Sequence, residues 1–280
     1  MSLKNIIFLL RLSHWSKAVF VLLGVIYAEN AGYWGKALLA ALAFCFIASA
    51  VYIYNDLHDL EEDRAHPQQS HRPLANGDVS IGIACLMLIA CLFIGLLLGF
   101  VISVNLLIIL SVYLLINLLY NHWLRRVPLC DVICIASGFM LRILAGTIGI
   151  GLPITWWLTV TATLLSLFIA LSKRRLELQL GLKNTQRAVL RKYDPHVLDM
   201  LIASTASSCF IAYLLYTVYA RNENVYFLLT LPFCAIGLWR FSILSTKNGK
   251  KDDPVAIFLS DNVSRLNLLC FISLTMLALF

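Results

Sequence analysis

The sequence predicts an all-α membrane protein whose helices cross the bilayer nine times. Of its 280 residues, 60% are hydrophobic and only 13% are charged, which is too little charge for a soluble domain of this size. The apolar residues gather in runs that can span a bilayer, which takes about 20 mostly apolar residues per helix. The longest polar stretch, near 173–198, is too short for a second domain, so we expect one integral membrane domain over 1–280.

The expected spans follow one another with short polar connections. They cover 15–32, 36–54, 80–101, 103–120, 129–149, 153–172, 199–220, 224–244 and 263–280. The first follows the short apolar segment NIIFLL, which Arg11, His14 and Lys17 interrupt, so this segment predicts an interfacial helix rather than a cleavable signal. The third follows a loop that contains the turn residues Pro73 and Gly77.

Cations predict the orientation of the chain. Seventeen Lys and Arg residues fall in the N-terminus and in the polar segments at the ends of the second, fourth, sixth and eighth spans, against Lys36 and Arg221 on the other side. The seventeen are Lys4, Arg11, Lys17, Arg64, Arg72, Arg125, Arg126, Lys173, Arg174, Arg175, Lys183, Arg187, Arg191, Lys192, Lys247, Lys250 and Lys251. This bias predicts a cell inner membrane protein with these segments in the cytoplasm. Topology explains most of the +7 net charge, so no nucleic-acid partner is expected, and the rest suits an anionic substrate.

An acidic segment, NDLHDLEED, directly follows the second span. If the helix continues past Tyr54, then Asn55, Asp59 and Asp63 recur at i, i+4 and i+8, and Asp56 lies one step around from Asn55. Like charges at this spacing repel one another unless cations bind to them. Mg²⁺ prefers carboxylate oxygens and completes its shell with waters and substrate phosphates, so the stripe predicts a Mg²⁺ site. The alternative is a helix end that is solvated by its charges.

The same segment resembles the NDxxDxxxD motif of the UbiA superfamily of intramembrane prenyltransferases. The topology of the whole chain is similar to that family's nine helices around a central cavity. The resemblance implies that Asn55, Asp56, Asp59 and Asp63 hold Mg²⁺ against a diphosphate at the cytoplasmic end of the second span. It also implies that the three aspartates are the catalytic residues.

The end of the sixth span departs from this family, whose members carry a second aspartate-rich motif there. This chain has ALSKRRLELQLG, in which Lys173 and Glu177 stand four residues apart on one helix face with Arg174 beside them. A cation-rich set with a single acid therefore replaces two carboxylates. It suits a substrate with an extra phosphate, because lysine binds phosphate as a point charge and arginine as a fork.

Further segments resemble one branch of the family, the decaprenyl-phosphate phosphoribosyltransferases of the cell envelope. They include RLSHWSKAVFVLLGVIYA, RRVPLCDV, LRILAG, SKRRLEL and DDPVAIFLSDNVS. The resemblance implies transfer of 5-phosphoribosyl from phosphoribosyl pyrophosphate to a polyprenyl phosphate. Pyrophosphate would leave, and Mg²⁺ would be the cofactor.

Several side chains are expected to bind these substrates beside the metal. Lys173, Arg174 and Arg72 are expected to contact phosphates of the donor, and Glu177 to accept hydrogen bonds from ribose hydroxyls. Tyr193, in RKYDPH, is expected to touch the sugar; the alternative is an interfacial tyrosine. Catalysis would be mostly positioning and charge stabilisation, because the acceptor phosphate is already anionic near pH 7.

Ionisable residues within the apolar runs add to this site. Arg142 lies inside the fifth span and Asp131 near its cytoplasmic entrance. An arginine at the centre of a spanning helix costs about 2.5–3.5 kcal/mol on insertion scales, so it normally faces a polar cavity or a partner. We expect Arg142 and Asp131 to line the cavity and help hold a phosphate; a structural pair or a snorkelling cation is the alternative. Lys17, near Trp15, is either an interfacial anchor or a contact to the acceptor lipid phosphate.

Two other functions stay open at this point. A prenyltransferase that moves a polyprenyl group from a diphosphate to an aromatic acceptor would share the acidic segment, but it predicts a second aspartate motif where SKRRLEL stands. A lipid-phosphate transporter would use Arg142 and a basic face, but it gives no reason for a carboxylate stripe. Lipid chain length and the formation of homo-oligomers are not specified by the sequence.

Overall fold

All regular structure in the described part of the chain is helical. The computed structural model describes residues 3–28, 30–65, 69–154, 156–179, 193–221, 224–247 and 254–279. Within these ranges every regular element is a helix, which confirms the predicted all-α class. Six of the predicted cytoplasmic cations lie outside the described residues: Lys183, Arg187, Arg191, Lys192, Lys250 and Lys251.

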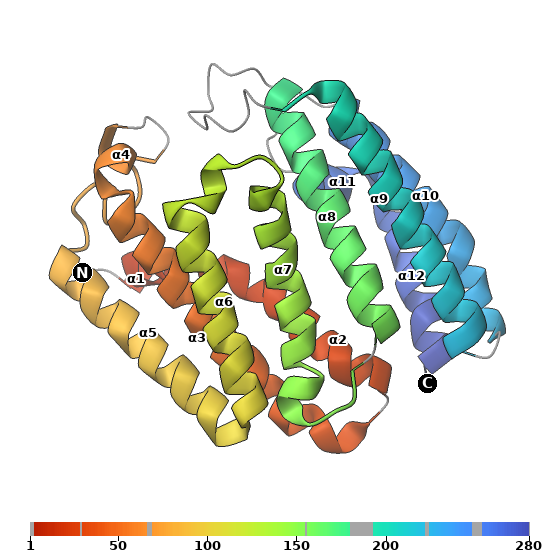
Figure 1. Ribbon diagram of the computed structural model, residues 1–280, viewed down its shortest axis with the longest axis horizontal. Coiled ribbons are helices and arrows are strands. Elements are labelled where there is room, and N and C mark those ends of the chain that lie inside the picture. The colour runs from red at the N-terminus through yellow and green to blue at the C-terminus, as the bar shows by residue number, and fades with distance from the viewer. Residues whose placement is uncertain are drawn as a thin grey trace. The chain divides into compact units, whose positions relative to one another are not determined.

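Twelve α-helices carry the chain through the described ranges, and short 3-10 or π segments extend several of them (Figure 1). The α-helices are α1 (Leu3–Leu9), α2 (Val19–Ala28), α3 (Trp34–His58), α4 (Leu60–Ala65), α5 (Ile81–Ile102), α6 (Val104–His122), α7 (Cys130–Ala145), α8 (Trp156–Gln179), α9 (Pro195–Leu215), α10 (Val225–Lys247), α11 (Pro254–Ser260) and α12 (Asn262–Leu279). The 3-10 segments are η1 (Leu12–Ala18), η2 (Ala31–Tyr33), η3 (Leu124–Arg126) and η4 (Ile148–Ile150), and the π segment is η6 (Tyr216–Ala220).

Eight of the described helical segments are long and apolar enough to cross a bilayer, and they correspond to the second to ninth predicted spans. The first predicted span, 15–32, is shorter in the structure, where η1 and α2 together cover Leu12–Ala28. A 3-10 helix rises about 2.0 Å per residue and an α-helix about 1.5 Å, so the two segments reach about 29 Å at most. That length is close to the ~30 Å hydrocarbon core of a bilayer.

Large apolar side chains are exposed along the spanning helices. On α5, for example, Leu86, Phe93 and Val101 are 67%, 66% and 72% exposed. Apolar surface of this extent is rare on soluble monomers and is typical of a lipid-facing helix. Together with the long apolar helices, it identifies a multi-pass membrane protein.

The described helices form two compact units. The first consists of Met1–His122 with Leu141–Ile154, and the second of Trp123–Met140 with Thr155–Phe280, so that α7 contributes to both. No long polar linker marks this division in the sequence, because the boundaries fall beside η3, within α7 and before α8.

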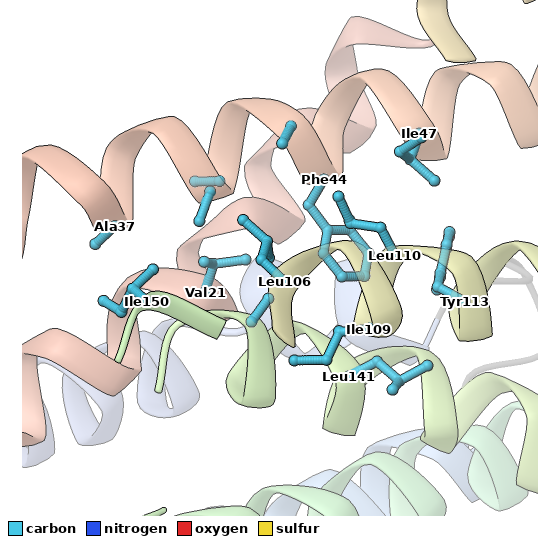
Figure 2. Close-up of a cluster of buried hydrophobic side chains, with 14 of the residues drawn as sticks. Val21, Ala37, Phe44, Ile47, Leu106, Ile109, Leu110, Tyr113, Leu141 and Ile150 are labelled. Carbon is cyan, nitrogen blue, oxygen red and sulfur yellow. The ribbon is translucent and has the colours of Figure 1, made fainter. Parts of the chain in front are cut away.

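In the first unit, α3 packs against α2, α5 and α6. Its buried face begins with small side chains, among them the fully buried Ala37, Ala40 and Ala43, which allow neighbouring helices to approach closely. Larger side chains then fill the core: Figure 2 shows Phe44 of α3 near Leu110 of α6. This packing holds α3, the helix that carries the acidic segment, on several sides.

Two glycines allow α2 to cross the segment that follows α7. A Cβ atom on Gly146 would lie 1.7 Å from the carbonyl oxygen of Val21, and one on Gly24 would lie 2.2 Å from the carbonyl oxygen of Gly146. Only a residue without a Cβ fits at either position. The crossing fixes the end of α7, where the Gly146 N–H donates to the Arg142 carbonyl oxygen over 3.2 Å.

In the second unit, α8 packs against α9, and α10 against α12. Phe168 and Leu171 of α8 share a core with Leu198 of α9 and Phe241 of α10. These contacts hold the end of α8, which carries the predicted substrate-binding residues.

Candidate functional site

The acidic residues lie where α3 ends and α4 begins. Asp59 departs from ideal helix geometry, with φ −96° and ψ 14°. The backbone hydrogen bonds nevertheless continue through it: the Asp59 N–H donates to the Asn55 carbonyl oxygen over 2.9 Å, and the Asp63 N–H to the Asp59 carbonyl oxygen over 2.8 Å. The helix therefore extends past Tyr54 as predicted, with a local turn at Asp59. We call Asn55, Asp56, Asp59 and Asp63 the acidic site.

Two arginines bind the buried carboxylates of the acidic site. Asp56 and Asp63 stand two helical turns apart and are 3% and 2% exposed. Nη1 of Arg72 lies 2.6 Å from Oδ2 of Asp63 and 3.2 Å from Oδ1 of Asp56. Nη2 of Arg11 donates to the same Oδ1 of Asp56 over 2.6 Å. Arg72, predicted to contact a donor phosphate, contacts these carboxylates in the structure.

The other two members of the acidic site have neutral or weakly basic partners. Oδ1 of Asn55 accepts a short hydrogen bond from Nδ2 of Asn121, a buried residue of α6. Oδ1 of Asp59 lies 2.9 Å from Nδ1 of His58. The Asp59 side chain is 22% exposed, which makes it more accessible than the carboxylates of Asp56 and Asp63.

The donor set of the acidic site suits Mg²⁺ by its chemistry. Three carboxylates and one amide oxygen are the hard oxygen ligands that this ion prefers. Within the described residues, no three acidic, histidine or cysteine side chains converge as a ready-made metal cluster. Arg11 and Arg72 supply the positive charge in this arrangement. Burial raises the pKa of Asp63, and the Arg72 guanidinium opposes this shift, so the carboxylate gains from any added cation.

In the second unit, Arg174 at the end of α8 lies between two carboxylates. Its Nε donates to Oδ2 of Asp131 over 2.7 Å, and its Nη1 to Oε2 of Glu177 over 2.6 Å. The side chains of Arg174 and Asp131 are each 1% exposed. Burial of a charge costs several kcal/mol unless it is paired, so both carboxylates are needed to keep this guanidinium inside the protein. We call Asp131, Arg174, Glu177 and Tyr193 the buried arginine network.

Tyr193, which lies two residues before α9, completes this network. Its hydroxyl donates to Oδ1 of Asp131 over 2.6 Å and accepts from the Leu129 N–H over 2.7 Å. Asp194 caps α9, because its side chain accepts a hydrogen bond from the His196 N–H over 2.7 Å. This cap holds the backbone at the start of the helix, next to Tyr193. Burial and the Asp131 carboxylate raise the pKa of Tyr193 above its usual range. The structure thus gives the hydroxyl that was expected at the sugar two partners within the protein.

Lys173 and Glu177 differ in their surroundings, although the sequence places them on one helix face. Lys173 is exposed, whereas Glu177 is buried and pairs with Arg174 three residues before it. The next cation, Arg175, donates from Nε to Oδ1 of the exposed Asp199 over 2.8 Å. Lys173 is therefore the accessible cation of the predicted phosphate-binding set at this helix end.

Arg142 lines a small cavity in the first unit, which we call the basic cavity. It has a volume of about 10 Å³, and its lining includes His14, Trp15, Phe44, Cys45, Tyr52 and Arg142. The Arg142 side chain is 6% exposed, and its Cζ lies 4.7 Å from the ring centre of Phe44 and 5.3 Å from that of Tyr113. Asp131, which was expected to line a cavity with Arg142, belongs to the buried arginine network instead.

Lys17 lies in η1, on the segment that supplies His14 and Trp15 to the basic cavity. Its side chain is half-buried. Nε1 of Trp15 donates to Oγ of Ser49 over 3.0 Å, which ties η1 to α3. The 3-10 segment at the start of the first span is therefore anchored to α3.

A second cavity in the first unit lies beside Asn121. It has a volume of about 140 Å³ and lies among α3, α5 and α6. Its walls are mostly apolar, with Leu88, Leu92 and Leu114 among the lining residues, and Asn121 and Tyr54 are polar members of the lining. Because Asn121 also binds Asn55, the wall of this cavity touches the acidic site.

Sequence reasoning missed the roles of four residues in the first unit. Arg11 was expected only as a cation that sets topology, yet it binds Asp56. Asn121, His14 and Tyr52 carried no local signal, because a single polar residue in an apolar run has many structural explanations. For the contact of Arg11 with Asp56, the one sign in the sequence was the position of an arginine a few residues before the first predicted span.

Comparisons with known proteins agree on one family. A model of the UbiA prenyltransferase family matches residues 18–262. The decaprenyl-phosphate phosphoribosyltransferase of Corynebacterium glutamicum is 29% identical over 285 aligned residues, which cover 97% of this chain and 85% of that protein. The protein of the same name from Mycolicibacterium smegmatis is 30% identical over 263 residues, which cover 88% of this chain and 80% of that protein.

The fold is similar to that of solved structures. A UbiA homolog from Archaeoglobus fulgidus bound to GPP and Mg²⁺ superimposes with a TM-score of 0.72. The match covers 96% of this chain and 99% of that chain, at 20% sequence identity. At this identity the likeness shows the fold.

Proposed function

Since the chain belongs to the UbiA prenyltransferase family, we propose that it transfers 5-phosphoribosyl from phosphoribosyl pyrophosphate to a polyprenyl phosphate. The bond from ribose C1 to pyrophosphate breaks, pyrophosphate leaves with the electron pair, and a phosphate oxygen of the lipid forms the new bond to C1. The relatives named decaprenyl-phosphate phosphoribosyltransferase support this reaction. The observation that carries the proposal is the end of α8, where Lys173, Arg174 and Glu177 stand in place of a second acidic motif.

The acidic site is assigned to the leaving group. Asp56, Asp59 and Asp63 are the proposed carboxylate ligands of Mg²⁺, with the amide oxygen of Asn55 beside them. When bound, the ion supplies positive charge to the departing diphosphate. Arg11 and Arg72 are already within hydrogen-bond distance of these carboxylates, so their guanidinium groups add positive charge at the same place.

The end of α8 is assigned to the rest of the donor. Lys173 is exposed and suits the 5-phosphate as a point charge. Arg174 forms ion pairs with Asp131 and Glu177. We propose that it binds a phosphate of the donor only after one of these ion pairs has opened. Glu177 is the proposed acceptor of ribose hydroxyl hydrogen bonds, and Tyr193 supports the site by holding Asp131.

The acceptor needs little activation. A polyprenyl phosphate carries negative charge near pH 7, so its oxygen attacks without a strong general base. The rate enhancement then comes from positioning and from charge stabilisation at the leaving group. We assign the basic loops to the cytoplasmic side of an inner membrane, where a water-soluble donor is available.

The transfer assay tests this proposal directly. Purified protein in detergent is incubated with ribose-labelled phosphoribosyl pyrophosphate, a polyprenyl phosphate and Mg²⁺, and the label in the organic phase is counted. We expect label in the lipid only when all three are present. If no label transfers, while the protein prenylates an aromatic acid from a polyprenyl diphosphate, the donor assignment is wrong. A panel of other phosphosugar diphosphates tests donor identity.

A further inference from the structure

The basic cavity gathers polar and aromatic side chains from three elements of the first unit. His14 and Trp15 come from η1, Tyr52 from α3 and Arg142 from α7. None of the described residues that line it is acidic. A cavity that presents a guanidinium, an imidazole and a phenol hydroxyl inside an apolar helical unit is suited to an anion.

Two of these side chains, His14 and Tyr52, contact each other, and Arg11 extends this contact toward the acidic site. Nδ1 of His14 lies 3.0 Å from the hydroxyl oxygen of Tyr52. The Arg11 guanidinium covers the Tyr52 ring, with Cζ 4.8 Å from the ring centre, and also binds Asp56. Arg11 therefore joins the acidic site to Tyr52, and Arg142 of α7 adds a second guanidinium to the lining of the cavity.

We propose that the basic cavity binds the phosphate monoester of the polyprenyl acceptor, an inference that rests on the proposed function. Tyr52 and Ala48 stand one and two helical turns before Asp56, which is about 6 and 12 Å along α3 toward the membrane interior. A water-soluble donor reaches the acidic site from the polar end of α3, whereas a lipid phosphate arrives from the membrane. The donor diphosphate at the acidic site and the lipid phosphate in the basic cavity would then lie one to two helical turns apart. Ribose C1 fits between them, because the attacking oxygen must approach C1 to about 3–3.5 Å.

The size of the cavity limits what enters it. Its volume of about 10 Å³ accommodates about one water molecule, which is also about the size of one phosphoryl oxygen. One oxygen of the monoester therefore binds among His14, Tyr52 and Arg142. The remaining oxygens and the ester-linked chain stay outside, which leaves one of them available for attack on C1.

Binding of farnesyl phosphate tests this assignment without any transfer reaction. The thermal unfolding temperature of the detergent-solubilised protein is measured with farnesyl phosphate and with farnesol, which lacks the phosphate. We expect a larger stabilisation by farnesyl phosphate in the wild type and no difference between the two ligands in Arg142→Gln. Arg221→Gln is the matched control: Cζ of Arg221 also covers two aromatic rings, those of Tyr216 at 5.4 Å and Phe227 at 5.1 Å, and it should behave as wild type.

Steady-state kinetics distinguish the lipid phosphate from the 5-phosphate of the donor. Arg142→Gln should raise the KM for the polyprenyl phosphate at least tenfold and change the KM for phosphoribosyl pyrophosphate less than twofold. A rise in the donor KM alone, or two unchanged KM values, overturns the assignment. If Arg142→Gln does not fold, Tyr52→Phe and His14→Phe replace it, each with an expected rise in the lipid KM of about threefold.

The two proposals fail in different ways. If the wild type transfers no label from phosphoribosyl pyrophosphate, but farnesyl phosphate binding still requires Arg142, the donor assignment fails and the phosphate site stands. If transfer occurs and farnesyl phosphate binding is the same in Arg142→Gln as in wild type, only the assignment of the basic cavity is wrong.

Discussion

Nη2 of Arg11 lies 2.6 Å from Oδ1 of Asp56, although 45 residues separate them in the chain. Arg11 adopts the left-handed conformation, with φ 50° and ψ 50°, which costs a non-glycine residue about 1–2 kcal/mol. The contact to Asp56 and the stacking on Tyr52 offset this cost. The N-terminal segment therefore brings a cation to the proposed metal ligands, and we expect that cation to compete with a bound metal for the same carboxylate.

Removal of the Arg11 charge should tighten metal binding. Arg11→Gln leaves Asp56 with Arg72 as its remaining cationic partner, so the negative potential at the acidic site increases. We expect the apparent Kd for Mn²⁺, measured by isothermal titration calorimetry, to fall at least threefold. Arg11→Lys retains the charge and should stay within twofold of wild type. An unchanged or weaker Kd in Arg11→Gln would show that Arg11 does not compete with the metal.

Asp59 should be indispensable for transfer. Its carboxylate is more accessible than those of Asp56 and Asp63, which are buried and paired with arginines, so it is the proposed ligand that a metal reaches most easily. Asp59→Asn should lower the transfer rate at least 100-fold with little change in the unfolding temperature. Glu62→Gln, an exposed acid on α4, is the control and should retain more than half of the activity. Equal activities in the two variants would remove Asp59 from the site.

Lys173 should affect the donor more than the lipid. It is the exposed cation beside the buried arginine network, so Lys173→Ala should raise the KM for phosphoribosyl pyrophosphate about tenfold and leave the lipid KM within twofold. Arg175→Gln removes a cation from the next position, where Asp199 is its partner, and should change neither KM more than twofold. An unchanged donor KM in Lys173→Ala would exclude it from donor binding.

Asp131 and Asp199 should differ sharply in their effect on stability. Asp131→Asn leaves the buried Arg174 with one carboxylate fewer and should lower the free energy of unfolding by about 3–5 kcal/mol. Asp199→Asn breaks a pair whose carboxylate is 47% exposed and should cost less than about 1 kcal/mol. Chemical denaturation of both variants in the same detergent measures the difference. Similar losses would contradict the buried character of the Arg174 pair.

The crossing of α2 by the segment after α7 should not tolerate a methyl group. Gly146→Ala would place Cβ 1.7 Å from the Val21 carbonyl oxygen, so the backbone must move and the yield of folded protein should fall severely. Gly82→Ala, in α5, meets nothing within 4 Å and should be neutral or slightly stabilising. Monodisperse elution in size-exclusion chromatography reports both outcomes. Wild-type behaviour of Gly146→Ala would contradict the close crossing.

The sequence by itself determined the all-α membrane class, eight of the spans and the acidic segment. These features are local: hydropathy depends on runs of neighbouring residues, and a helix places Asn55 and Asp59 on one face whatever surrounds it. The start of the first span was less predictable, because η1 is a 3-10 helix whose contacts to α3, such as Trp15 to Ser49, form only in the folded chain.

Only the tertiary structure decided which cation meets which acid. The local pattern placed Lys173 and Glu177 on one helix face. The folded chain instead pairs Arg174 with Asp131, 43 residues away, and it pairs Arg11 with Asp56. Asn121 likewise reaches Asn55 across 66 residues. A buried charge or amide must find a partner wherever packing provides one, and packing depends on contacts between helices that no short window of sequence contains.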